Sequence, residues 1–205
     1  MAEPDYDSMP IQVMTGLEPI RLRPTMYVGN LEDPALSVRL LMQALCHAAD
    51  CAIDGTCRRI SVVAAGTVAT VSYDAGLPLE VHPRLGDIVA LLFLTMHCGC
   101  RNLKKHIEVG DDLCDLGLAT LTALAEDLRV ETRSHGKTAI YHFARGLELE
   151  PSQIVEAVGD DITTMTVQLD ASLLGRNVVF DLDQLDAALE RLRSRIPRLE
   201  VSLTR

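Results

Sequence analysis

Residues 34–54 read PALSVRLLMQALCHAADCAID and carry the clearest helix pattern in the chain. Apolar residues recur every three or four positions from Leu36 to Ile53, which is the spacing that gathers side chains on one face of an α-helix. Pro34 stands just before this stretch, and proline is common in the first turn of a helix. The pattern predicts a long helix over 35–54 with one buried face.

Strand and helix patterns alternate around this helix. Strand-like alternation occurs at 59–64 and 68–73, with Gly66 in the turn between them, and again at 128–133, 139–144, 163–169 and 200–203. Further helices are predicted at 12–21, 86–96, 116–128 and 182–194. Interleaved helices and mostly antiparallel strands predict an α/β (α+β) two-layer sandwich.

The ends of the chain and the loops complete this layout. Residues 1–10 are predicted to form an N-terminal arm, and 11–205 a single domain. Pro24 ends the first helix, and residues 26–29 are expected to be extended. A polar loop is predicted at 98–112.

Composition excludes several classes of protein. Hydrophobic residues make up 48% of the 205, which is enough for a full core and too much for a disordered chain. The net charge is −10 and the 19 Lys and Arg residues are scattered, which argues against a nucleic-acid partner. No apolar run reaches the ~18 residues of a membrane span, and the acidic N-terminus is unlike a signal peptide. We therefore expect a cytoplasmic protein with no membrane partner, whose six cysteines are reduced thiols or metal ligands.

Several motifs occur in a recognisable order. They are YDS at 6–8, GLEPIRLRPTMYVG at 16–29, DCAID at 50–54, GLP at 76–78, HP at 82–83, MHCGCR at 96–101 and TMTV at 164–167. In order and spacing, nearly the whole chain resembles the ATPase domain of gyrase B and of its topoisomerase IV counterpart. The resemblance implies a GHKL (Bergerat) fold, in which ATP lies between helices and a glycine-rich lid. No counterpart of the transducer or DNA-cleaving regions is present, so this chain by itself is not expected to be a topoisomerase.

The chain differs from that family at the positions where the family has its catalytic and metal-binding residues. The resemblance places His47 where the family has its water-activating Glu, and Cys51 where it has a Mg²⁺-binding Asn. A thiol is a poor magnesium ligand. Ser72 stands in place of the adenine-reading Asp, and Asp74, further along the strand, regains that role only through a slip in register. These changes predict that ordinary Mg²⁺-dependent ATP hydrolysis is lost.

The lid of the family is also replaced. Its glycines correspond here to a segment with three aspartates, Asp111, Asp112 and Asp115, which would repel ATP. The acidic segment reads as a solvated loop, as a cap for the helix that starts near Leu116, or as a site for a cationic ligand.

Other family positions are retained. The resemblance assigns Asp54, Gly76, Pro78 and Thr164 to the floor and adenine end of the pocket. Tyr6 belongs to an arm that embraces a second copy in the family, so a homodimer through the arm is a candidate partner arrangement.

The altered pocket suggests a new lining. His47 and Cys51 are four residues apart, on one helix face, with Asp50 beside them. By the resemblance, the loops that edge the same pocket carry further thiols, at Cys98, Cys100 and Cys114. These five residues are a candidate set for zinc or another transition metal. Without a metal, His47 is a candidate acid–base group, since the reference pKa of histidine is near 6.5, and Cys51 a candidate ligand contact. The remaining alternative is a structural one, with buried thiols and a solvated histidine.

Three functions follow. The first is a repurposed pocket that binds or transforms a non-nucleotide small molecule, with Asp50, Asp54, Tyr73, Asp74, Gly76, Pro78 and Thr164 as ligand-binding residues. The second is a non-catalytic gyrase-B mimic that sequesters inhibitors or docks on gyrase itself. The third is residual ATP binding with little hydrolysis.

Overall fold

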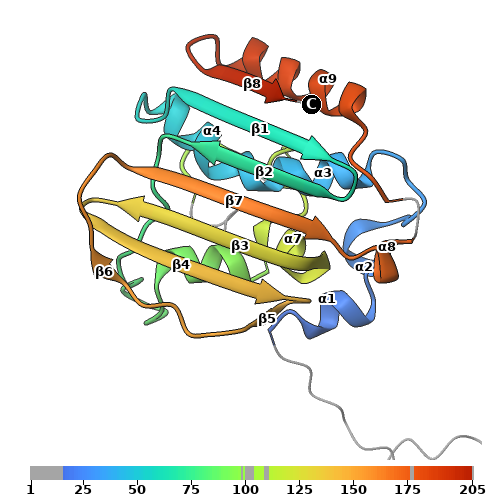
Figure 1. Cartoon of the computed structure of the whole chain (residues 1–205), viewed down its shortest axis with the longest axis horizontal. Coiled ribbons are helices and arrows are strands. Elements are labelled where there is room, and N and C mark those ends of the chain that lie inside the picture. Colours follow the sequence, from blue (N-terminus) through green and yellow to red (C-terminus); the bar gives the residue numbers. More distant parts are fainter. Residues whose placement is uncertain (1–15, 98, 100–103, 109–110, 176–177, 205) are drawn as a thin grey trace, which may run out of the picture.

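A computed structural model describes residues 16–97, 99, 104–108, 111–175 and 178–204. A single eight-stranded sheet forms one layer, in the order β5-β4-β3-β7-β2-β1-β8, with β6 beside β4 (Figure 1). All pairs in it are antiparallel except β1 with β8. The strands are β1 (Arg59–Ala65), β2 (Val68–Tyr73), β3 (Ala125–Ser134), β4 (Lys137–Ala144), β5 (Leu147–Glu148), β6 (Val155–Glu156), β7 (Ile162–Leu169) and β8 (Glu200–Thr204).

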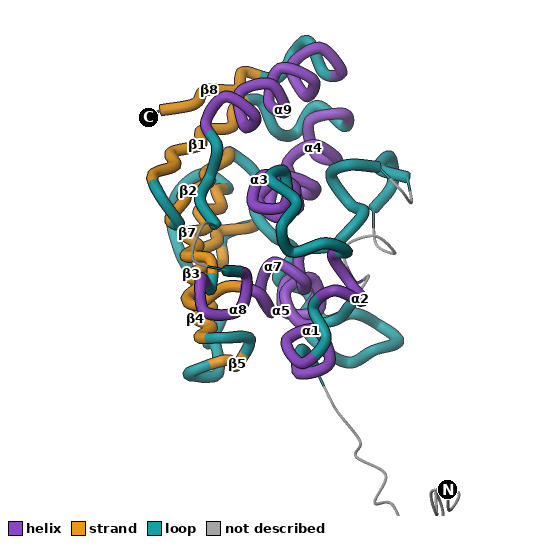
Figure 2. Tube along the Cα trace, turned by 90° about the vertical axis from the view of Figure 1, so that its right-hand side faces the viewer, coloured by secondary structure: helices purple, strands orange, loops and turns teal. Residues whose placement is uncertain are grey.

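The main helices form the second layer, on one face of this sheet (Figure 2). Their bounds are α1 (Glu18–Leu22), α2 (Thr25–Val28), α3 (Leu36–Met42), the 3₁₀ turn η2 (Gln43–Leu45), α4 (Cys46–Ile53), α5 (Val89–Thr95), α7 (Leu118–Leu124), α8 (Ala171–Leu174) and α9 (Leu182–Arg195). Strand residues alternate between buried and accessible, as in β2, where Ala69, Val71 and Tyr73 face the core. This one-sided burial confirms the predicted two-layer sandwich.

Some expectations about individual elements were wrong. Residues 26–28 are not extended, because a separate helix, α2, begins directly after Pro24, whose φ of −58° suits a helix start. The helix predicted at 116–128 is confined to Leu118–Leu124, since Ala125 already begins the pairing of β3 with β7. The predicted arm, including Tyr6, lies outside the described residues.

One helical run reaches membrane-spanning length, contrary to expectation. The run Leu36–Ile53 is 18 residues long and apolar enough by composition. However, 83% of it is buried inside the protein. Such burial is typical of a core helix.

Arg21, from the 16–29 motif, ties α1 to the sheet. Its guanidinium donates hydrogen bonds to the carbonyl of Ala123 (2.6 Å) and to the carboxylate of Asp170 (2.6 Å), whose side chain is 1% exposed. At least one residue of the motif therefore has a structural role, because Arg21 neutralises the buried carboxylate of Asp170, directly after β7.

We expect Arg21→Ala to lower the free energy of unfolding by about 2 kcal/mol, because it removes the main partner of a buried carboxylate. Arg23→Ala is the matched control, since Arg23 is exposed and nearby; it should change stability by less than about 0.5 kcal/mol. Urea unfolding of both variants measures the difference. Equal losses would show that the contact between Arg21 and Asp170 contributes nothing.

Candidate functional site

His47 lies on α4 and is enclosed by groups from three other segments. The Lys104 ammonium, which can only donate, bonds to Nδ1 of the ring (2.6 Å). The ring therefore carries its proton on Nε2, which donates to the carbonyl of Gly76 (2.8 Å). The rings of Tyr73 and Phe93 flank it at centroid distances of 6.3 and 5.9 Å. Both ring nitrogens are thus engaged within the protein.

This environment fixes the charge of His47. Burial lowers its pKa to about 3, and the positive charge of Lys104 contributes in the same direction, against smaller opposing effects of Gly76 and Asp50. The reference value near 6.5, on which the acid–base role rested, does not hold in the folded chain. The ring is neutral at physiological pH.

Cys51 and Asp50, on the same helix, lie near His47, as the spacing predicted. The Cys51 thiol is 3.5 Å from Nε2 of His47, and burial raises its pKa, which disfavours the thiolate needed for nucleophilic attack or metal binding. The Asp50 carboxylate accepts hydrogen bonds from the backbone N–H groups of Lys105 (3.2 Å) and His106 (2.8 Å).

Asp54 holds the side chains of the same loop. It accepts from Nε2 of His106 (2.6 Å) and from the Lys105 ammonium (3.2 Å), and these bonds lower its pKa. Lys104, Lys105 and His106 therefore fasten a loop onto α4. The sequence analysis did not single out these three residues, although the adjacent lysines at 104 and 105 were a signal.

The segment Ala75–Leu77 is held by a closed chain of hydrogen bonds. Thr163 Oγ1 donates to the carbonyl of Ala75 (2.8 Å), so Thr132 Oγ1 must donate to Thr163 (2.9 Å). Thr132 in turn accepts from the N–H of Leu77 (2.8 Å). Both hydroxyls are buried, and each one donates its proton and accepts one hydrogen bond within this chain. Pro78, next in the chain, accepts from the N–H of Ala90 at the start of α5 (2.9 Å).

Thr164 and Asp74 do not join this cluster. Thr164 and Ser72 are directly paired across β7 and β2, with their hydroxyls 3.1 Å apart, on the sheet face away from the core. Their neighbours Tyr73 and Thr163 face the core instead, because successive residues of a strand point to opposite faces. Asp74 accepts from the backbone N–H groups of Arg58 (2.8 Å) and Arg59 (2.9 Å) and thereby supports the start of β1.

The cysteines are not gathered at one point in the described part of the chain. Cys114 contacts Cys46, with the sulfurs 3.2 Å apart, and both are buried. Burial, then the Asp74 carboxylate, raises the pKa of Cys57 to about 12. Cys98 and Cys100 lie outside the described residues. Among the described ones, no group of three or more His, Cys, Asp or Glu could hold a metal ion.

Two of the three aspartates of the acidic segment are paired with arginines, whereas Asp112 is exposed to solvent, as the solvated-loop alternative expected. Asp111 pairs with Arg195 of α9, and Asp115 with Arg39 of α3 (3.0 Å). Asp115 also accepts from the N–H of Leu116 (2.8 Å), and Gln43 accepts from the N–H of Gly117 (2.9 Å). Gly117 is itself the N-cap of α7 and no side chain caps that helix, so the capping alternative was wrong.

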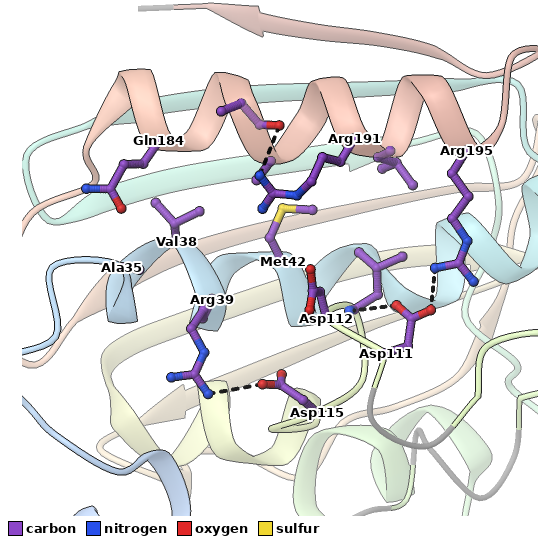
Figure 3. A pocket seen from close by; sticks show the side chains of 14 residues that line it. Ala35, Val38, Arg39, Met42, Asp111, Asp112, Asp115, Gln184, Arg191 and Arg195 are labelled. Atoms are coloured by element: carbon purple, nitrogen blue, oxygen red, sulfur yellow. Dashed lines mark hydrogen bonds and ion pairs between the residues drawn. The ribbon is translucent and has the colours of Figure 1, made fainter.

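A pocket of about 620 Å³ opens between this segment, α3 and α9 (Figure 3). Neither His47 nor Cys51 lines it. The sequence predicted only a helix at 182–194, so the polar residues that α9 adds to this pocket were not anticipated.

The amino-acid sequence is similar to those of known gyrase B and topoisomerase IV proteins. No model of a known protein family matches the chain. The gyrase B protein of Thermotoga maritima is 27% identical over 199 residues, covering 96% of this chain and 31% of that protein. The corresponding DNA topoisomerase 4 protein of Bartonella bacilliformis is 28% identical over 88% of this chain and 27% of its own length. The chain thus spans about a third of the length of these relatives.

A solved structure supports the same relationship. The 43K ATPase domain of Thermus thermophilus gyrase B, in complex with an aminocoumarin, matches with a TM-score of 0.72 and 27% identity. The match covers 92% of this chain and 48% of that one. The sequence matches and the structural match both extend over nearly the whole chain. The protein is therefore a homologue of the GHKL ATPase domain of gyrase B and of its topoisomerase IV counterpart.

Proposed function

We propose that this chain is a gyrase-B-like domain that has lost ATP hydrolysis and acts by binding a non-nucleotide small molecule. The observation that carries the proposal is the state of His47. A residue in the place of a water-activating carboxylate must accept a proton. His47, with a pKa of about 3, is a very weak base, and both of its nitrogens are engaged within the protein.

The metal and adenine positions support the same proposal. Cys51, in the place of the magnesium ligand, is a thiol whose pKa is raised by burial. Tyr73 occupies the core-facing position where β2 ends, and the hydroxyl protons of Thr132 and Thr163 are already donated within the protein. No carboxylate points from these residues toward the core to read an adenine.

The same geometry favours binding over chemical transformation. An acid–base group works best with a pKa near the working pH, and the pKa of His47 lies far below it. The hypothesis of His47 as a catalyst is therefore set aside in favour of a binding module, for which we propose a cytoplasmic location. Self-association through the arm remains a proposal, to be tested by comparing the native mass of the full chain with that of a chain lacking residues 1–10.

We expect no ATP turnover above the protein-free rate, and no rise in melting temperature at millimolar Mg²⁺-ATP. A gyrase B ATPase domain assayed in parallel is the positive control. Saturable hydrolysis that disappears in His47→Ala would overturn the proposal.

A second candidate is a gyrase-B mimic that sequesters inhibitors. Its motivation is that the matching Thermus domain was solved in complex with an aminocoumarin. Calorimetric titration with an aminocoumarin distinguishes the two: micromolar or tighter binding supports the mimic, and no detectable heat removes it.

A further inference from the structure

The pocket between α3, α9 and the acidic segment is separate from the former nucleotide site. At about 620 Å³ it has the size of a small-molecule site. Its apolar walls come from both helices and the loop, and include Val38, Met42, Leu113 and Leu192. Apolar walls with a few polar groups aimed inward are typical of ligand sites.

The charges around this pocket are unevenly paired. Arg39 and Arg195 are both neutralised, by Asp115 and Asp111. The Arg191 guanidinium, which points from α9 toward the pocket (Figure 3), has no carboxylate within ion-pair distance among the described residues. Its one described bond is a long one, 3.4 Å, to the carbonyl of Ala187 on its own helix. A guanidinium with free donors at an apolar wall is suited to a carboxylate, which it can bind through two parallel hydrogen bonds.

We propose that this pocket binds a small organic carboxylate with an apolar body, anchored by Arg191 and packed against Met42 and Leu192. The inference rests on the proposed binding function and names its site and ligand class. Asp112 also lines the pocket, and its carboxylate has no ion-pair partner within the described part of the chain. It should oppose a second negative charge on the ligand, so a monoanion fits better than a dianion.

The test uses 4-phenylbutyrate as probe and the uncharged 4-phenylbutanamide as its matched analogue, titrated by calorimetry into the full chain. The carboxylate should bind at least about tenfold more tightly than the amide, and Arg191→Gln should remove most of that preference. Arg198→Gln is the control for loss of one exposed arginine outside the pocket and should bind like the native chain. Asp112→Asn should bind the carboxylate as tightly as the native chain or more tightly.

Arg191 is exposed, so its variant should keep the native melting temperature, and this separates lost binding from lost folding. Three results would each overturn the inference: no binding of the probe, equal binding of the amide, or unchanged affinity in Arg191→Gln. None of these would affect the ATPase measurement. Conversely, ATP turnover with intact probe binding would overturn the proposed loss of hydrolysis and leave this site in place.

Discussion

Gly76→Ala is expected to lower the free energy of unfolding by at least about 3 kcal/mol, or to prevent folding. A methyl group at this position would lie 2.2 Å from the carbonyl oxygen of Arg133 and 2.5 Å from Cβ of Ser134. The first of these is backbone of β3, which is held on both sides by β4 and β7 and cannot shift without disturbing the sheet. If residue 76 moved instead, its own carbonyl, which accepts a hydrogen bond from His47, would be displaced.

Gly55→Ala is the matched control. Gly55 has a φ of +80° but nothing within 4 Å of the added methyl, so only backbone strain of about 1 kcal/mol is expected. Urea unfolding followed by circular dichroism compares the two variants. If Gly76→Ala is no less stable than Gly55→Ala, the close approach of the two backbones is not a constraint on this fold.

Local patterns in the sequence predicted helices and turns, but they could not predict the requirement for glycine at position 76. The hairpin through Gly66 was predicted correctly, and so was the helical run over 35–54 apart from the 3₁₀ turn η2 that divides it into α3 and α4. These patterns are local and repeat with the period of the structure. The reason for Gly76 is a contact with β3, more than fifty residues away, and no local pattern encodes it.

The register of the strands was the second limit. Matching letters to the family placed Thr164 and Ser72 in the pocket, yet both lie on the outer face, and Thr163 and Tyr73 are buried instead. A shift of one residue reverses every side chain of a strand. Only the pairing of β2 with β7 settles which hydroxyl faces the core.

The surroundings of His47 were the third limit, because they come from residues distant in sequence. The i, i+4 spacing placed Cys51 beside it correctly. The spacing could not show that Lys104 and Gly76 would use both ring nitrogens. A residue type suited to proton transfer was thus predicted without the environment that sets its pKa.

That environment predicts a specific loss of stability in acid. The folded pKa of His47 is about 3 and the unfolded value is near 6.5. Between these values the unfolded chain takes up a proton that the folded chain does not, so the free energy of unfolding falls as the pH falls. The loss is about 1.4 kcal/mol per pH unit, begins near pH 6.5 and ends near the folded pKa. Above pH 6.5 this residue makes no pH-dependent contribution to stability.

His47→Gln isolates the contribution, since an amide can donate to Gly76 and accept from Lys104 but does not titrate. Urea unfolding at pH 8, 6.5, 5.5 and 4.5 should show the native chain losing about 2 to 3 kcal/mol more than the variant between pH 6.5 and 4.5. All carboxylates are common to both chains, so their titration cancels in the difference. Parallel curves would mean that His47 protonates as readily when folded as when unfolded. An imidazole that titrates near pH 6.5 in the folded chain would again be available for proton transfer, and the choice of a binding module over an enzyme would have to be reversed.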